Sequence, residues 1–214
     1  MESAVAFLIA QGWASGLSVW AVLVITGIAD RLGYVDAPGL LGSPWVLAGS
    51  ALLLAVEFVA DKVPFLDSVS DTAQTLVRPL VGAGIGAEWA SAGGHLPGWA
   101  GAVIAGGTAL ASHGAKMGIR AAVNTSPEPV SNVLVSSAED TMLAGVVAFS
   151  FAHPTEAAVA ALILLAVGVG LAVWLVMLVR RLLRSRRRPP PGRWAPRTPV
   201  QRWITGDRDA AADN

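Results

Sequence analysis

The chain has 214 residues, of which 54% are hydrophobic and only 14% are charged. A typical soluble domain has about 25% charged residues, and here the apolar residues come in long blocks. The composition therefore excludes an ordinary soluble domain and predicts a polytopic helical membrane protein. The chain contains no cysteine, which excludes disulfides, thiolate metal ligands and a cysteine nucleophile.

The apolar blocks predict an all-α bundle of six transmembrane helices. These helices are expected at about residues 4–29, 44–60, 71–92, 98–118, 130–152 and 155–179. The first block is long for one crossing, so we expect a tilt or a break at residues 12–16. Gly82, Gly84 and Gly86 are expected to give the third helix a small-residue face for close packing.

The C-terminal part of the chain predicts the orientation of the bundle. We expect residues 1–183 to form the transmembrane domain and the basic, proline-rich residues 184–214 to form a disordered tail. Six arginines follow the last helix, at Arg180, Arg181, Arg184, Arg186, Arg187 and Arg188. Six crossings place both termini on one side, and the positive-inside rule makes that side the cytoplasm. The arginines are expected to contact anionic lipid headgroups rather than nucleic acid.

The balance of basic residues also bears on the source of the chain. Arginine outnumbers lysine thirteen to two, a bias common in GC-rich bacterial genomes. We therefore expect the protein to reside in the inner membrane of a bacterial cell.

Two pairs of predicted helices resemble each other. Trp45 precedes Lys62 by seventeen residues, and Trp99 precedes Lys116 by the same number. In the hinge after each pair, a serine is followed eight residues later by a charged residue, Arg78 after Ser70 and Glu139 after Ser131. This pattern predicts a parallel two-helix pseudo-repeat. Equivalent positions could then meet, so we predict an intramembrane ion pair between Arg78 and Glu139, which would offset the cost of charge at bilayer depth.

Carboxylates near the cytoplasmic halves of the second and fifth predicted helices form the candidate site. Glu57 and Asp61 are spaced i, i+4 and share one helix face, where two carboxylates can bind a hard cation or pass a proton. Glu139 and Asp140 lie at a similar predicted depth, so these four residues are the candidate ion or proton ligands. The sequence assigns no metal and contains no motif for a cofactor.

A polar hinge accompanies the carboxylates. It consists of Lys62, Asp67, Asp71, His113, Lys116, Arg120 and Asn124. For Asp67 and Asp71 a simpler interpretation is a solvated loop with a helix cap.

Several phrases resemble a known family. They are V-E-F-V-A-D-K-V-P-F-L-D at residues 56–67, K-M-G-I-R-A-A-V-N-T-S-P-E-P-V-S-N at 116–132 and A-E-D-T-M at 138–142. Together with I-A-D-R at 28–31 they look like the bacterial membrane family called domain of unknown function 4126. The resemblance covers roughly residues 10–150. It implies a fold and a membrane location, and it brings no activity and no functional residue.

Three functional hypotheses follow from these features. The first is a small cation- or proton-coupled transporter or channel, acting as a homo-oligomer because few helices rarely enclose a path alone. The second is a non-transporting scaffold or lipid-interacting protein with structural ion pairs, and the third is a membrane enzyme using acid–base chemistry. Transport requires Glu57 to face a hydrated cavity shared with Glu139 or Asp140. A scaffold requires that Glu57 be neutralised, by Lys62, Lys116 or Arg120, with no cavity beside it.

Overall fold

A computed structural model describes the backbone of residues 1–63, 66–123 and 129–186. It describes the side chains of the same ranges except residues 67–68, 122–123, 129–132 and 183–186. The chain divides into two compact units, Met1–Val179 and Arg180–Asn214. The candidate site lies in the first unit. The larger part of the predicted tail, residues 187–214, lies outside the described residues.

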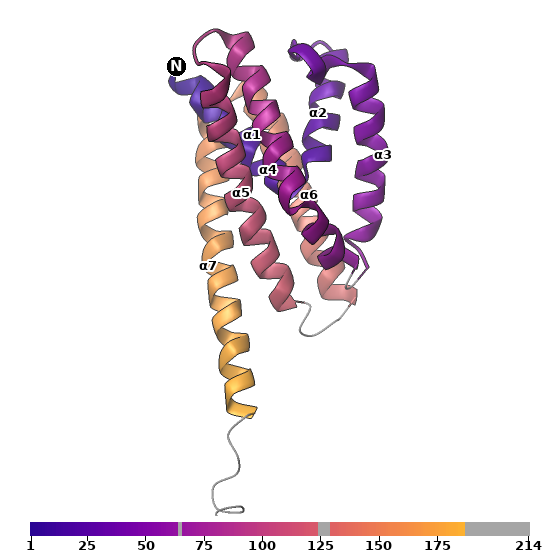
Figure 1. The fold of residues 1–214 in the computed structure, drawn as a ribbon, viewed down its shortest axis with the longest axis vertical. Helices are drawn as coiled ribbons and strands as arrows, with labels where there is room; N and C mark the ends of the chain where they lie inside the picture. Colours follow the sequence, from indigo (N-terminus) through magenta and orange to yellow (C-terminus); the bar gives the residue numbers. More distant parts are fainter. Residues whose placement is uncertain (64–65, 124–128, 187–214) are drawn as a thin grey trace, which may run out of the picture. The chain divides into compact units, whose positions relative to one another are not determined.

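The described part of the chain is helical and contains no strand, which confirms the all-α prediction (Figure 1). The elements are α1 (Glu2–Leu17), α2 (Val19–Arg31), the short 3-10 helix η1 (Gly39–Gly42), α3 (Pro44–Ala60), α4 (Leu66–Gly93), α5 (Gly98–Val123), α6 (Pro129–Ala152) and α7 (Pro154–Arg186). The five predicted helices from residue 44 onward all occur. Pro44 begins α3, at a position where its missing N–H costs no hydrogen bond.

The prediction of one first helix is wrong, because Ser18 separates α1 from α2. Its backbone is extended, with φ −154° and ψ 107°, and its hydroxyl accepts a hydrogen bond from the Ala21 N–H at 3.2 Å. Ser18 is thus the N-cap of a new helix. The break lies beyond residues 12–16 because Gly12 and Gly16 serve close packing against α5: a Cβ on Gly16 would lie 2.2 Å from the Ala109 carbonyl oxygen.

The two short helices fold back on each other (Figure 1). Near the start of α1, the ring of Phe7 packs against Trp89 and Phe151, with centroids 5.0 and 5.9 Å apart. The end of α2 also reaches Phe151, with which Ile28 and Leu32 share an apolar pocket. The outer ends of both helices therefore lie at the end of the unit where α6 stops. This arrangement differs from a single first crossing, and six crossings are not confirmed.

The remaining helices run alternately away from that end and back to it (Figure 1). Pro154, which begins α7, lines the same pocket as Ser3 and Phe7. Further along α7, Ala172 lies beside Gly118 near the far end of α5. Within residues 1–179, α1 thus begins at the end opposite to the one that α7 approaches.

Small residues let α4 and α5 pack at close distance. A Cβ on Gly86 would lie 2.3 Å from the Gly101 carbonyl oxygen, and a Cβ on Gly82 would lie 3.1 Å from the Ala109 Cβ. The predicted small-residue face is confirmed for these two glycines. Gly84 has no atom of another element within 4 Å, because a residue two positions away points to a different side of the helix.

Apolar side chains cover much of the outside of the unit. Among the described residues, two segments are long and apolar enough to cross a membrane, Val133–Ala152 and Pro154–Leu182, and Pro44–Ala60 is a shorter apolar helix. The apolar windows of the two long segments are only 28% and 6% buried. The core helix of a soluble protein would be mostly buried, so these helices present apolar surface outward.

Candidate functional site

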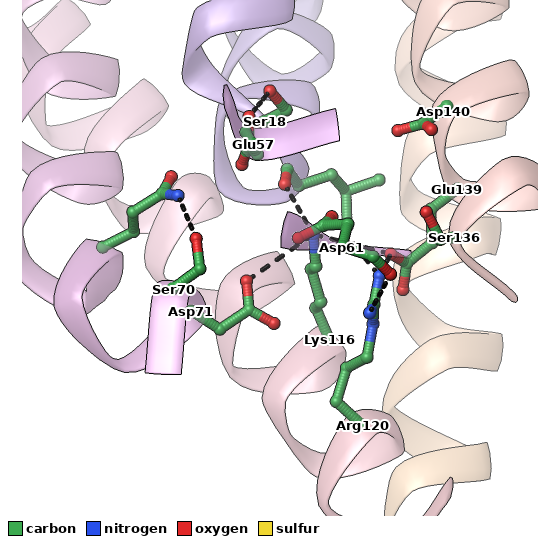
Figure 2. Close-up of polar contacts among 12 residues, drawn as sticks. Ser18, Glu57, Asp61, Ser70, Asp71, Lys116, Arg120, Ser136, Glu139 and Asp140 are labelled. Carbon is green, nitrogen blue, oxygen red and sulfur yellow. Dashed lines mark hydrogen bonds and ion pairs between the residues drawn. The ribbon is translucent and has the colours of Figure 1, made fainter. Parts of the chain in front are cut away.

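Seven charged side chains from α3 to α6 gather in the interior, and each residue is at most 8% exposed. We call this set the charge centre. Its members are Glu57, Asp61, Asp71, Arg78, Lys116, Arg120 and Glu139. Asp61 lies at the C-terminal cap of α3, and Figure 2 shows it between Lys116 and Arg120. Charged groups with so little access to water are stable only when they are paired.

Arg78 organises one half of the charge centre. Its Nη2 atom lies 2.5 Å from Glu57 Oε1 and 2.9 Å from Asp71 Oδ1. Its Nε donates to Gln74 Oε1 at 2.9 Å. One guanidinium therefore serves two carboxylates, one from the preceding helix and one from its own helix two turns earlier.

The contact between Arg78 and His113 fixes the state of the imidazole. Arg78 Nη1 lies 3.0 Å from His113 Nδ1, and a guanidinium can only donate hydrogen bonds. His113 Nδ1 must then accept, which leaves the proton on Nε2, 3.3 Å from Thr75 Oγ1. His113 is accordingly a neutral member of the surroundings and contributes no charge.

Lys116 and Arg120 organise the other half. Lys116 Nζ lies 3.1 Å from Asp61 Oδ2 and 3.5 Å from Glu139 Oε2. Arg120 Nη2 lies 3.0 Å from the same Glu139 oxygen and 3.4 Å from the same Asp61 oxygen. Two cations and two carboxylates thus form a closed square. Asp71 Oδ1, 3.6 Å from Lys116 Nζ, connects this square to the Arg78 half.

The break between α1 and α2 reaches into the charge centre. At the end of α1, the Gly16 carbonyl accepts from Arg78 at 3.4 Å and the Leu17 carbonyl accepts from Lys116 at 3.1 Å. The Ser18 hydroxyl donates to Glu57 Oε2. The negative end of the α1 dipole therefore faces two cations. Ser18 is a member of the site that the sequence did not predict, although a serine capping an apolar run is a signal for a helix start.

A second, more exposed ion pair lies beside the charge centre. Lys62 Nζ lies 3.1 Å from Asp140 Oδ2, and it donates to Ser136 Oγ at 2.6 Å. The two charged side chains are 19% and 39% exposed. The four predicted ligands thus separate: Glu57, Asp61 and Glu139 belong to the charge centre, and Asp140 lies outside it.

Two interpretations from the sequence need correction. The direct ion pair between Arg78 and Glu139 does not occur among the described residues, because Glu57 and Asp71 take the Arg78 guanidinium while Glu139 binds Lys116 and Arg120. Asp71 is not a solvated cap: it is fully buried, and α4 begins five residues before it.

The other residues of the predicted polar hinge fall into two groups, those at the charge centre and those whose side chains the structure does not describe. Lys116, Arg120 and the neutral His113 lie in or against the charge centre. The side chains of Asp67 and Asn124 lie outside the described residues.

Four of the cavities formed by the described residues have linings that include no member of the charge centre. One apolar groove between α2, α3 and α6 is bordered by Asp140 and Leu143. In the described part of the chain, no cluster of three or more histidine or acidic side chains could hold a metal ion.

Comparison with known proteins identifies the family. The family model described as a domain of unknown function (DUF4126) matches residues 5–177. The chain therefore belongs to this family, as the sequence phrases indicate. No curated protein and no solved structure matches the chain.

Proposed function

We propose that this member of the DUF4126 family is an integral membrane protein whose charge centre carries a proton or a small cation across the bilayer. One observation supports this most strongly: a broken helix pair ends inside a buried cluster where four carboxylates face three cations. Transporters commonly place discontinuous helices around their coupling ions, using the free carbonyls and helix ends. Ionisable groups within membrane helices are costly and mark ion or proton paths.

The placement in the membrane is part of the proposal. The outward apolar surfaces of α6 and α7 support contact with lipid. In this arrangement α3 to α7 cross the bilayer, while the α1–α2 hairpin enters from one side as far as Ser18. Backbone at such a break is tolerated because protein donors satisfy its carbonyls.

The hairpin changes the expected topology. The start of α1 and Val179 would lie on opposite sides, in place of the expected arrangement with both termini in the cytoplasm. The bacterial inner membrane, the lipid contacts of Arg180 to Arg188, the homo-oligomer and the pseudo-repeat stay predictions.

Reconstitution in liposomes tests the proposal. Liposomes loaded with pH-sensitive and cation-sensitive dyes are given a proton or cation gradient, and protein-dependent flux is recorded. We expect flux with the wild type, strong loss with Glu57→Gln, and retention with the matched control Asp140→Asn, whose carboxylate lies outside the charge centre. Wild-type flux no greater than that of empty liposomes, or equal flux in Glu57→Gln, would contradict the proposal.

A specific observation also favours the second hypothesis, a non-transporting membrane scaffold. Both carboxylate oxygens of Glu57 have partners, Arg78 and Ser18, and Glu57 lines none of the four cavities described above. The neutralising cation is Arg78 rather than the expected Lys62, Lys116 or Arg120. For a scaffold, the same experiment gives no flux, and Glu57→Gln changes only the stability of the protein.

A further inference from the structure

Asp71 contains a buried oxygen that lacks a hydrogen bond. The residue is fully buried, and its Oδ1 atom lies 2.9 Å from Arg78 Nη2. Neither carboxylate oxygen has a hydrogen-bond partner among the described residues, and Oδ2, unlike Oδ1, also has no ion-pair contact there. By contrast, the second oxygen of Glu57 accepts from Ser18. Buried polar atoms in native proteins are almost always paired, so this one requires a specific explanation.

The charge centre holds more acids than bases. Its acidic members are Glu57, Asp61, Asp71 and Glu139, and its basic members are Arg78, Lys116 and Arg120. This count holds for the described side chains; those of residues 64–65, 67–68, 122–132 and 183–214 lie outside them. Lys62, the remaining lysine of the chain, is bound to Asp140.

The excess negative charge lies at the Arg78 half. Lys116 and Arg120 together neutralise Asp61 and Glu139. The single Nη2 atom of Arg78 serves both Glu57 and Asp71, and Lys116, which Asp61 and Glu139 already share, lies 3.6 Å from Asp71 Oδ1. Burying a carboxylate without its own counter-ion costs far more than burying a neutral carboxyl, and such groups take up a proton instead.

We propose that Asp71 holds an exchangeable proton on Oδ2, which acts as the fourth positive charge of the charge centre. The titratable and charged groups facing Asp71 are Glu57 from α3, Arg78 from α4, and Lys116 and His113 from α5. A proton fits this position because it removes the negative charge of the buried carboxylate, and no metal-binding cluster occurs among the described residues. The proposal deepens the proposed function by naming the proton as the ion, and it rests on that function only for movement of the proton across the membrane.

Infrared spectroscopy of the full chain in lipid nanodiscs at neutral pH tests this assignment. A protonated carboxyl gives a C=O stretching band that a carboxylate lacks, and the band shifts in heavy water. We expect such a band in the wild type, and we expect it to move when the aspartates alone carry ¹³C in the carboxyl group. This measurement requires no variant, so a folding defect cannot obscure it.

Variants then identify the aspartate. We expect Asp71→Asn to lose the band and the matched control Asp140→Asn to keep it. Asp71→Asn should also unfold at a temperature close to that of the wild type, because asparagine has the shape of the neutral acid. The proposal is overturned if the wild type lacks the band, if only ¹³C-glutamate moves it, or if Asp71→Asn retains it.

The two proposals fail in distinguishable ways. A band that depends on Asp71, without flux in liposomes, would refute transport and leave the proton assignment intact. Flux together with an absent band would refute the proton assignment alone.

Discussion

Replacing Gly86 by alanine is expected to destabilise the contact between α4 and α5. The new Cβ would lie 2.3 Å from the Gly101 carbonyl oxygen and 2.5 Å from the Ala105 Cβ, whereas ordinary contact begins at 3.4 Å. Neither neighbour is a flexible side chain, so the helices must separate by about 1 Å. Overpacking of this kind costs about 1–3 kcal/mol, of which the higher helix propensity of alanine returns roughly 0.5–1 kcal/mol. We therefore expect a net loss of stability.

The measurement is thermal unfolding in detergent, followed by circular dichroism, with Gly84→Ala as the matched control. Gly84 lies on the same helix, and its Cβ would meet no atom of another element within 4 Å. Gly84→Ala should be at least as stable as the wild type, because only the propensity gain applies there. If Gly86→Ala proves as stable as Gly84→Ala, α4 and α5 do not approach each other through this face.

Three further substitutions test separate contacts by the same unfolding measurement. Ser18→Ala removes the cap of α2 and the donor to Glu57, so we expect a loss of about 2–4 kcal/mol from the two effects together; no loss would mean that neither bond forms. Ser150→Ala leaves the buried Gln11 Nε2 without its partner at 3.0 Å, with an expected cost of about 1–3 kcal/mol, and unchanged stability would exclude that bond. Lys62→Met removes a partly exposed ion pair with Asp140 and should cost no more than about 1 kcal/mol; a larger loss would show that the pair belongs to the charge centre.

Most helices could be predicted from the apolar pattern because each forms one continuous block. The boundary between α1 and α2 could not, since the block at residues 4–29 stays apolar through the reversal. One residue, Ser18, changes the backbone direction and caps α2, and its hydrogen bond to Glu57 depends on how α3 packs. Hydropathy indicates whether a segment prefers an apolar environment, and it contains little information about where the chain reverses direction.

The members of the site were easier to predict than their partners. The i, i+4 spacing of Glu57 and Asp61 indicated a shared face, and both residues are buried in the charge centre. The partner of Arg78 could not be predicted, because that choice depends on how α3 and α4 pack. Asp71 was ambiguous because it follows a proline-containing hinge, where a solvated cap is common.

The buried pair of Glu57 and Arg78 is the central contact of the charge centre. Arg78→Gln leaves the buried Glu57 carboxylate without its cation, and breaking such a pair typically costs about 3–5 kcal/mol. Adding Glu57→Gln removes that stranded charge. Unfolding measurements of both variants in lipid nanodiscs should therefore show the double variant to be more stable than Arg78→Gln alone. If the double variant is equally stable or less stable, the two side chains do not meet in a shielded interior.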